Sequence, residues 1–231
     1  VRLAWAVTVS SAEHGAYLVM IDAESGEPQF RASLSAADVT PQYRVFTSES
    51  PTPMSPGFWN LADATAQPAT VGRSTVTIQA LNGTASPNGW ISDGKSTTKG
   101  DNVTAYADRD GDGSGTPVTG TGTNSRTFNF NVDLTQDPSN YTSASVVNLF
   151  YWCNWMHDQL YSLGFTASAG NFQGNDPVYA LAQRGAGNTA TTTNRNNSFF
   201  ATLADGTTPN GGLMQMFVSN TTSPARDAAF D

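Results

Sequence analysis

The chain has 231 residues, of which 13% are charged, and its formal net charge is −8. This length suits one large domain, or one domain with a small addition, and allows a sizeable apolar core. The negative charge disfavours nucleic acid and anionic lipid as partners, because both attract clusters of Lys and Arg. No apolar run approaches the roughly 18 residues that a membrane-spanning helix needs, so we expect no membrane partner either.

The composition also limits the chemistry. The single cysteine, Cys153, excludes an internal disulfide and any multi-cysteine metal site. The chain begins at Val1 with neither an initiator Met nor a signal peptide, so we expect a processed or partial protein. An acidic, cysteine-poor composition that is rich in Thr, Ser, Asn and Gly is typical of secreted bacterial proteins.

The N-terminal quarter of the chain indicates a small β-structure followed by a linker. Residues 3–34 alternate apolar and polar side chains between turn residues, which predicts a three-stranded meander. Four prolines between residues 41 and 56 interrupt regular structure and favour a linker or an extended segment. We therefore predict two units, residues 1–37 and 38–231.

The clearest predicted element is a long helix at residues 143–163. A hydroxyl side chain can cap its start, Gly164 can end it, and apolar residues recur at helical spacing on nearly every side. We expect this helix to be buried in the core. Short strands are predicted before it, at residues 74–81, 102–107 and 127–132. Further elements are predicted after it, namely a short helix at 177–183 and strands at 197–203 and 212–219. The predicted fold class is α+β, a β-rich lobe around one long helix.

Neither histidine belongs to a recognisable catalytic zinc motif. A His-Glu-x-x-His helix binds one ion with two His a turn apart, and neither His14 nor His157 begins such a motif. Neighbouring helical side chains point in different directions, so His157 and Asp158 are not expected to form a catalytic dyad. Cys153 lies on the apolar stripe of the helix, where a buried thiol is inert.

An acidic turn at residues 108–113 resembles the opening of a calcium-binding loop. Asp108, Asp110 and Asp112 alternate, and Gly113 follows as the turn residue. The twelfth position is Thr119 rather than the Glu that closes such loops. The turn therefore reads either as a site for calcium or another hard cation or as a solvated acidic turn.

The long helix and the segment after it resemble a known family. Residues 148–165 read NLFYWCNWMHDQLYSLGF, similar to the N-L-F-Y-W-x-N-x-M-H-D-x-x-Y-x-x-G-F segment of the fungalysins. These are secreted zinc metalloendopeptidases with a thermolysin-like catalytic domain. The run from Asn196 to Thr202 and Asp205-Gly206 resembles the N-N-A-x-F-A-T-x-x-D-G run of the same family. Upstream, residues 16–30 look like the last strands of a fungalysin propeptide.

This resemblance implies the end of a propeptide followed by the N-terminal lobe of a zinc peptidase. In the family the His-Glu-x-x-His helix follows soon after a sequence like Phe230-Asp231, so the zinc ligands and the catalytic Glu are expected in a C-terminal lobe outside this chain. Zinc would there activate the attacking water. The expected partners are that lobe, the propeptide and a peptide substrate, and this chain alone is expected to be inactive.

The resemblance also implies a substrate-binding edge. An extended substrate would pair with an edge strand of the lobe by β-augmentation, at Asn196, Asn197, Ser198 and Phe199. Two other interpretations stay open. One is a protease-like binding or scaffold module without catalysis. The other is an extracellular adhesion or carbohydrate-binding module that uses exposed aromatics such as Trp59 and Trp90.

Overall fold

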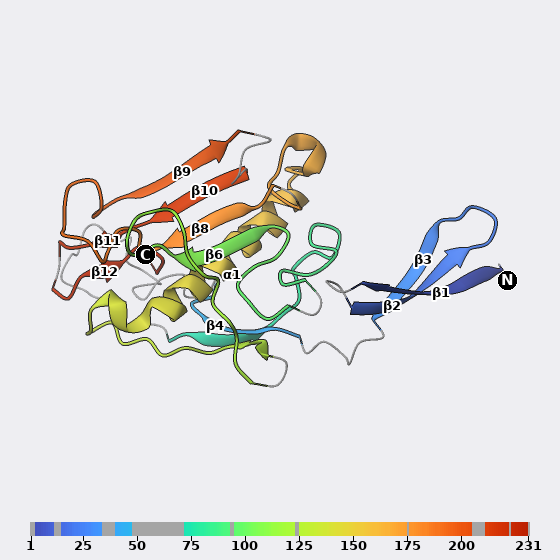
Figure 1. Cartoon of the computed structure of the whole chain (residues 1–231), viewed down its shortest axis with the longest axis horizontal. Coiled ribbons are helices and arrows are strands. Elements are labelled where there is room, and N and C mark those ends of the chain that lie inside the picture. Colours follow the sequence, from blue (N-terminus) through green and yellow to red (C-terminus); the bar gives the residue numbers. More distant parts are fainter. Residues whose placement is uncertain are drawn as a thin grey trace, which may run out of the picture.

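A computed structural model describes residues 3–11, 15–33, 40–47, 72–92, 95–122, 125–174, 176–204, 211–221 and 223–230, and all structural statements concern these. The N-terminal part is an antiparallel sheet in the order β1-β2-β3. Its strands are Ala4–Ser11, Gly15–Asp22 and Pro28–Ser33. The predicted meander is thereby confirmed, and Figure 1 shows it apart from the other elements. Its assignment to a propeptide, and the boundary near residue 37, remain predictions.

The main body contains one long helix between two sheets (Figure 1). Helix α1 spans Thr142–Ser162, within one residue of the prediction. It contacts β6 and β8 of a four-stranded sheet and β4 of a three-stranded one. The larger sheet has the order β6-β8-β10-β9, with strands Val103–Ala107, Val178–Ala182, Gly211–Met216 and Ser198–Leu203. The smaller has the order β5-β4-β7, with strands Ser74–Thr77, Gln42–Val45 and Thr127–Phe128.

The remaining regular elements are short. Strands β11 and β12 form a ribbon from Val218–Ser219 and Arg226–Asp227. Single 3-10 turns lie at Pro138–Tyr141, just before α1, and at Ala167–Ala169, just after it. In the larger sheet β6, β8 and β10 run parallel, whereas β9 runs antiparallel to β10. This mixture of helix and sheet agrees with the α+β class.

The core between α1 and the two sheets combines aromatic rings with aliphatic side chains such as Ile91 and Val146. Tyr43 stacks on Phe128 with 5.4 Å between ring centroids, and Trp90 meets Tyr151 edge-on at 5.4 Å. Phe150 of α1 is also fully buried. Trp90 has no exposed surface, so it cannot form the sugar-binding platform considered above, and Trp59 lies outside the described residues.

Two sequence predictions about this body were wrong. Residues 177–183 do not form a helix, because Val178–Ala182 is the interior strand β8 between β6 and β10. Its β-branched and aromatic residues suit that position, and pairing on both sides outweighs local helix propensity. Helix α1 is also not buried throughout. Its first half is buried, but Met156 and Leu163 near its C-terminal end are 45% and 84% exposed.

Candidate functional site

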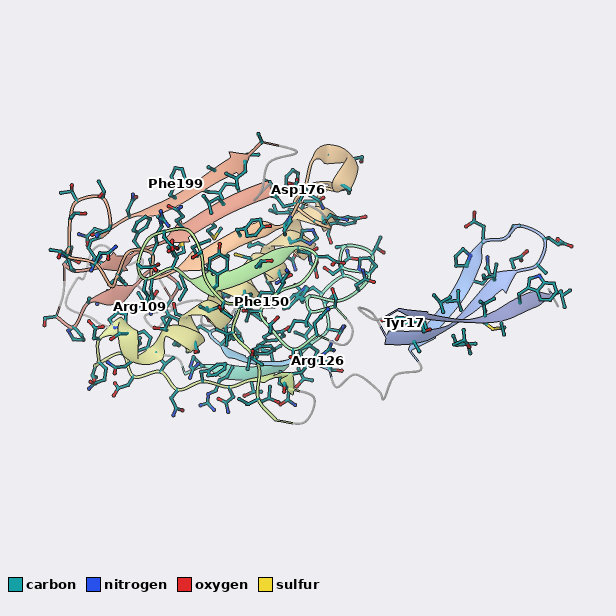
Figure 2. All side chains as sticks on the ribbon, viewed as in Figure 1. Tyr17, Arg109, Arg126, Phe150, Asp176 and Phe199 are labelled. Atoms are coloured by element: carbon teal, nitrogen blue, oxygen red, sulfur yellow. The ribbon has the colours of Figure 1, made fainter. Side chains whose placement is uncertain are left out.

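Strand β9 lies at the outer edge of the larger sheet and carries the predicted substrate-binding residues. It pairs with β10, with Phe199 opposite Gln215 and Phe200 opposite Met214. Figure 2 shows Phe199 on this outer strand. The free side of an edge strand presents unpaired backbone N–H and C=O groups. Phe199 and Phe200 are both nearly half exposed, at 48% and 46%.

Hydrogen bonds fix the entry into β9. Asn196 has a left-handed backbone, with φ at +55°, a conformation that Asn tolerates better than most residues. Its Nδ2 donates to Asn220 Oδ1 at 2.7 Å, and the Asn220 backbone N–H donates back to Asn196 Oδ1 at 2.9 Å. Asn197 accepts a bond from the backbone N–H of Phe217 at 3.3 Å. The structure thus brings Asn196, Asn197, Ser198 and Phe199 to the start of one edge strand.

One face of β9 borders a polar hollow of about 430 Å³. Its lining includes Arg184, Gly185, Asn188, Thr193 and Asn194 of the loop 184–194, together with Phe199 and Gln215 of the two paired strands. Arg195 holds this loop by donating to four backbone carbonyls, those of Gly185, Ala186, Asn188 and Asn194, at 2.8–3.0 Å. The Arg195 guanidinium is thus one group that fixes the loop, and Asn194 is another, since it accepts from the Thr191 N–H and donates to the Thr189 carbonyl.

The opposite face of β9 borders an apolar hollow of similar volume, about 430 Å³. It lies between the C-terminal half of α1 and the sheet. Its lining is Asn102, Val103, Leu149, Trp152, Cys153, Met156, His157, Leu160, Phe165, Phe172, Val178, Phe200 and Met214. Met156, Leu160, Phe165 and Phe200 are each more than a third exposed. A concave apolar surface of this kind is a candidate binding surface.

The predicted metal-binding carboxylates lie together. The oxygens of Asp108, Asp110 and Asp112 come within 4.8 Å of one another. Asp108 is fully buried and forms a close ion pair with Arg184, while Asp110 and Asp112 are exposed. Burial raises the pKa of Asp108 above its usual range, against the opposing effects of the Gly113 N–H and of Arg184. A cation at this turn would thus compete with Arg184 for Asp108.

The helix-geometry argument that His157 and Asp158 point apart was wrong, but the expectation that they form no catalytic dyad is unaffected. Although adjacent on α1, their side chains meet, with 3.1 Å between Nδ1 and Asp158 Oδ1. Side-chain torsions close the angular gap between neighbouring helix positions, and other bonds hold the carboxylate in place. Asp158 accepts bonds from Ser86 Oγ at 2.6 Å and from Trp90 Nε1 at 2.9 Å. The other ring nitrogen of His157 faces Asn171 Nδ2 at 3.3 Å. Both ring nitrogens of His157 thus have a polar neighbour.

The Asp158 carboxylate joins the long helix to the segment 81–90. It also accepts from the backbone N–H groups of Leu81 and Asn82, at 2.9 and 3.2 Å. Burial by itself raises its pKa, but the hydrogen bonds from His157, Ser86, Trp90 and Asn82 outweigh burial and bring the pKa below its usual value. All these donors hold one buried charge in place. We therefore interpret Asp158 as a structural joint, meaning a residue that fixes the segment 81–90 to α1, rather than as part of a proton-transfer dyad.

The described residues do not fit a catalytic zinc ion. Zinc in such enzymes prefers histidine nitrogen together with one carboxylate. The one cluster of three potential ligands in the described part of the chain is the all-carboxylate group Asp108, Asp110 and Asp112. Oxygen-only ligands suit hard cations such as calcium instead. Cys153 is no candidate ligand, since burial raises its thiol pKa to about 12 and its sulfur contacts Met214 at 3.6 Å.

Comparison with known proteins gives the family. The profile described as "Fungalysin metallopeptidase (M36)" matches residues 58–231. The chain therefore belongs to the fungalysin family of metallopeptidases, in agreement with the resemblance of residues 148–165. In the structure that segment makes up most of α1 and carries the His157–Asp158 contact.

Several relatives are similar over much of the chain. "Extracellular metalloproteinase mep" of Aspergillus fumigatus is 33% identical over 242 aligned positions, which cover 99% of this chain and 34% of the relative. "Extracellular metalloproteinase 10" of Coccidioides posadasii is 39% identical, covering 64% of this chain and 24% of the relative. "Extracellular metalloproteinase 5" of Trichophyton tonsurans is 37% identical, covering 63% and 24%. The chain thus spans about a quarter to a third of the length of these relatives.

No helix in the described residues is both long and apolar enough to cross a membrane.

Proposed function

We propose that this chain is the N-terminal part of a secreted zinc metalloendopeptidase, and that its β9 edge binds the backbone of a peptide substrate. The observation that carries this proposal is the position of β9, an outer strand whose free side can pair with an extended peptide. Family membership and relatives named extracellular metalloproteinases support the reaction class and secretion.

In this proposal the residues of the chain bind and orient the peptide. The backbone of β9 forms a ladder with it and so aligns the bond to be cleaved. Asn196 and Asn197 fix the start of that strand, and Asn197 accepts the Ser198 N–H at 2.9 Å. Since the described residues do not fit a catalytic zinc ion, we propose that the metal ligands belong to a part of the protein outside these 231 residues.

The apolar hollow supports a further part of the proposal, a partner lobe. A half-exposed surface of Met156, Leu160 and Phe165 is costly to leave in water. We propose that the C-terminal catalytic lobe covers this surface with apolar side chains of its own. We further propose that the β1–β3 meander is the end of a propeptide that keeps the enzyme latent.

Binding of a peptide to β9 can be tested directly with this chain. Hydrogen exchange of the backbone amides would be followed with and without a short, end-blocked peptide of alternating Leu and Thr. We expect slower exchange at Ser198–Leu203, because the peptide would cover the free side of that strand. Unchanged exchange at β9, with protection appearing elsewhere, would contradict the proposed binding edge.

The expected inactivity of the isolated chain has its own test. We expect the pure chain to show no cleavage of casein or of a quenched fluorescent peptide when zinc is added. Cleavage that chelators abolish, and that persists through further purification, would show that these 231 residues carry a metal site after all.

A second candidate is a non-catalytic, protease-like binding module, which agrees equally well with the misfit between the described donors and zinc. The sequence of the complete gene distinguishes the peptidase from the binding module. A His-Glu-x-x-His motif in the same reading frame, followed by a Glu some 25 residues later, supports the peptidase. A complete gene without that motif leaves a binding function for the β9 edge.

A further inference from the structure

Strand β1, Ala4–Ser11, is a free edge of the N-terminal sheet. Among the described elements it pairs with β2 alone, in unbroken register, and Figure 1 shows the meander clear of the main body. Its sequence, AWAVTVSS, contains neither a charged residue nor a proline. Natural sheets normally protect a long edge strand with charges, prolines or bulges, because its open backbone groups can pair with a further strand. Strand β1 has none of these protections.

The open backbone groups of β1 belong to its even-numbered residues. The Ala23 N–H donates to the Leu3 carbonyl at 3.0 Å, on the β2 side of the strand. In an antiparallel ladder the N–H and C=O of one residue point to the same side, and that side alternates along the strand. The groups that point away from β2 are therefore those of Ala4, Ala6, Thr8 and Ser10.

The apolar side chains of β1 lack a neighbour on their outer flank. Trp5, Val7 and Val9 lie on one face of the sheet and are 63%, 38% and 49% exposed. The residues opposite them on β2 are less exposed, because β2 has a strand on each side, and these residues are Ile21, Val19 and Tyr17. A further strand beside β1 would cover its apolar side chains on the outer flank in the same way.

Strand β1 is complementary to itself about Val7. If a second copy lies antiparallel to it, with a two-fold axis at Val7, then Trp5 of each copy is opposite Val9 of the other. Residues directly opposite each other share a face, so the apolar stripe of one copy continues into that of the other. On the other face the opposed residues are all small and uncharged, namely Ala4 with Ser10 and Ala6 with Thr8. A two-fold contact requires such self-complementarity.

This register also suits the open backbone groups. The even-numbered residues would exchange hydrogen bonds, so Val7 and its copy form a non-hydrogen-bonded pair, in which side chains come closest. A two-fold axis at Thr8 would also pair the open groups, but it would place Trp5 opposite Ser11 and so lose the apolar match.

Antiparallel pairing keeps the main bodies of the two copies apart. Tyr17, which pairs with Val9, marks the end of the meander nearest to the main body, and the N-terminus marks the far end (Figure 1, Figure 2). The two bodies therefore lie at opposite ends of the joined sheet. Their negative charges, −8 on each chain, are separated in this way.

From these observations we propose that two copies of this chain associate through β1. Their three-stranded sheets join into one antiparallel sheet with a two-fold axis at Val7. The contact is smaller than the roughly 1,200 Å² of a standard interface, so we expect a dissociation constant of about 10–100 μM. Salt should tighten it, because salt screens the repulsion between two negative chains. Pairing through β1 does not involve β9, the strand proposed above to bind substrate.

Sedimentation velocity measures this association directly. The chain would be studied from about 5 to about 500 μM, a range that brackets the expected dissociation constant. We expect a shift from monomer to dimer across this range, and more dimer in about 500 mM NaCl than in about 50 mM. A chain that stays monomeric at every concentration would overturn the proposal and leave the β1 edge to a partner of different sequence.

Two substitutions at one position test whether the backbone edge makes the contact. Thr8→Pro removes an N–H that points to the free edge, whereas the ladder to β2 uses the odd-numbered residues, so β1 can stay in its sheet. We expect association at least about tenfold weaker than in the unmodified chain. Thr8→Ala keeps the N–H and is the matched control, with association unchanged. Dimers of Thr8→Pro as tight as those of the unmodified chain would overturn pairing through β1, as stacking of the apolar faces would predict.

Cross-linking tests the register and does not depend on the folding of Thr8→Pro. In a Cys153→Ser background, Val7→Cys places two thiols opposite each other at the axis, where the Cα atoms are about 4.5 Å apart, within reach of a disulfide. Val9→Cys, the control, places them about 14 Å apart along the joined strands. On air oxidation, linked dimers of Val7→Cys should form at least about tenfold faster than those of Val9→Cys. Equal rates, or faster linkage of Val9→Cys, would overturn the register about Val7.

Discussion

The indole nitrogen of Trp90 donates to Asp158 Oδ2 at 2.9 Å and so connects two residues 68 positions apart in the sequence. Trp90 has no exposed surface, and the Asp158 side chain is equally inaccessible. A buried charge is stable only when hydrogen bonds replace the water it has lost. This pair therefore fixes the segment 81–90 against helix α1, which lies beneath the sheet that carries β9.

Replacing the buried carboxylate should destabilise the fold. In Asp158→Asn, one oxygen that accepts hydrogen bonds becomes an NH₂ group facing donors such as Trp90 and Leu81. We expect a loss of about 2–4 kcal/mol in the free energy of unfolding, measured with denaturant. Asp133→Asn removes the same charge from an exposed turn and should cost less than about 0.5 kcal/mol. Equal losses in the two variants would show that Asp158 is not a structural joint.

The same carboxylate gives a pH dependence of stability. The pKa of Asp158 is lower in the folded protein than its ordinary value, which is about 3.9. Its contribution to stability is therefore fully present above that ordinary value, and is lost as the pH falls toward the lower folded pKa. We expect the free energy of unfolding to fall between about pH 5 and pH 2, and to fall less steeply in Asp158→Asn. Parallel curves for the two proteins would contradict this.

The thiol of Cys153 should react slowly in the native protein. Burial raises its pKa to about 12, so almost none of it is the reactive thiolate at pH 8. Alkylation with iodoacetamide should be at least about a hundredfold slower than in the unfolded chain. The Cys153→Ser variant supplies the background rate. Labelling of the native chain at the unfolded rate would mean that the wall of the apolar hollow opens readily.

Removing the Arg195 guanidinium should loosen the loop that it holds. In Arg195→Met the side chain keeps much of its length but loses the donors to four carbonyls. We expect faster hydrogen exchange at residues 185–194 and a loss of about 1–3 kcal/mol in stability. Arg44→Met, at an exposed position of β4, serves as the control. Unchanged exchange in the loop would show that other contacts shape the polar hollow.

Calcium should have little effect on the acidic turn, because Arg184 already neutralises Asp108. We expect 1 mM CaCl₂ to raise the melting temperature by less than about 1 °C, since a ligand stabilises only in proportion to its binding. A rise of several degrees that Asp110→Asn and Asp112→Asn each abolish would instead show that the three carboxylates bind the ion.

The elements with a strong local pattern could be predicted from the sequence. Helix α1 and the β1–β3 meander carry such patterns and were found nearly at their expected bounds. Strand β8 was missed, since a short apolar run does not distinguish a helix from an interior strand. The exposure of Met156 also could not be read from periodicity, which shows a helix to be apolar without showing what covers it.

The candidate site was only partly accessible to sequence reasoning. The position of Asn196–Phe199 came from a resemblance, and the structure adds that these residues begin an outer strand. The His157–Asp158 contact was excluded on average helix geometry, yet the fixed position of Asp158 determines it. The role of Arg195 had no signal in the sequence, because its partners are backbone carbonyls, which every residue possesses.

Two hydrogen bonds between Asn196 and Asn220 join the chain just before β9 to the chain after β10. A strand that slips by one residue exchanges its two faces, and here such a slip would exchange Phe199 with Phe200 between the polar and the apolar hollow. Because this pair joins the chain just before β9 to the chain just after β10, it holds the register of the two strands at that end and keeps Phe199 and Phe200 on their own faces of the sheet.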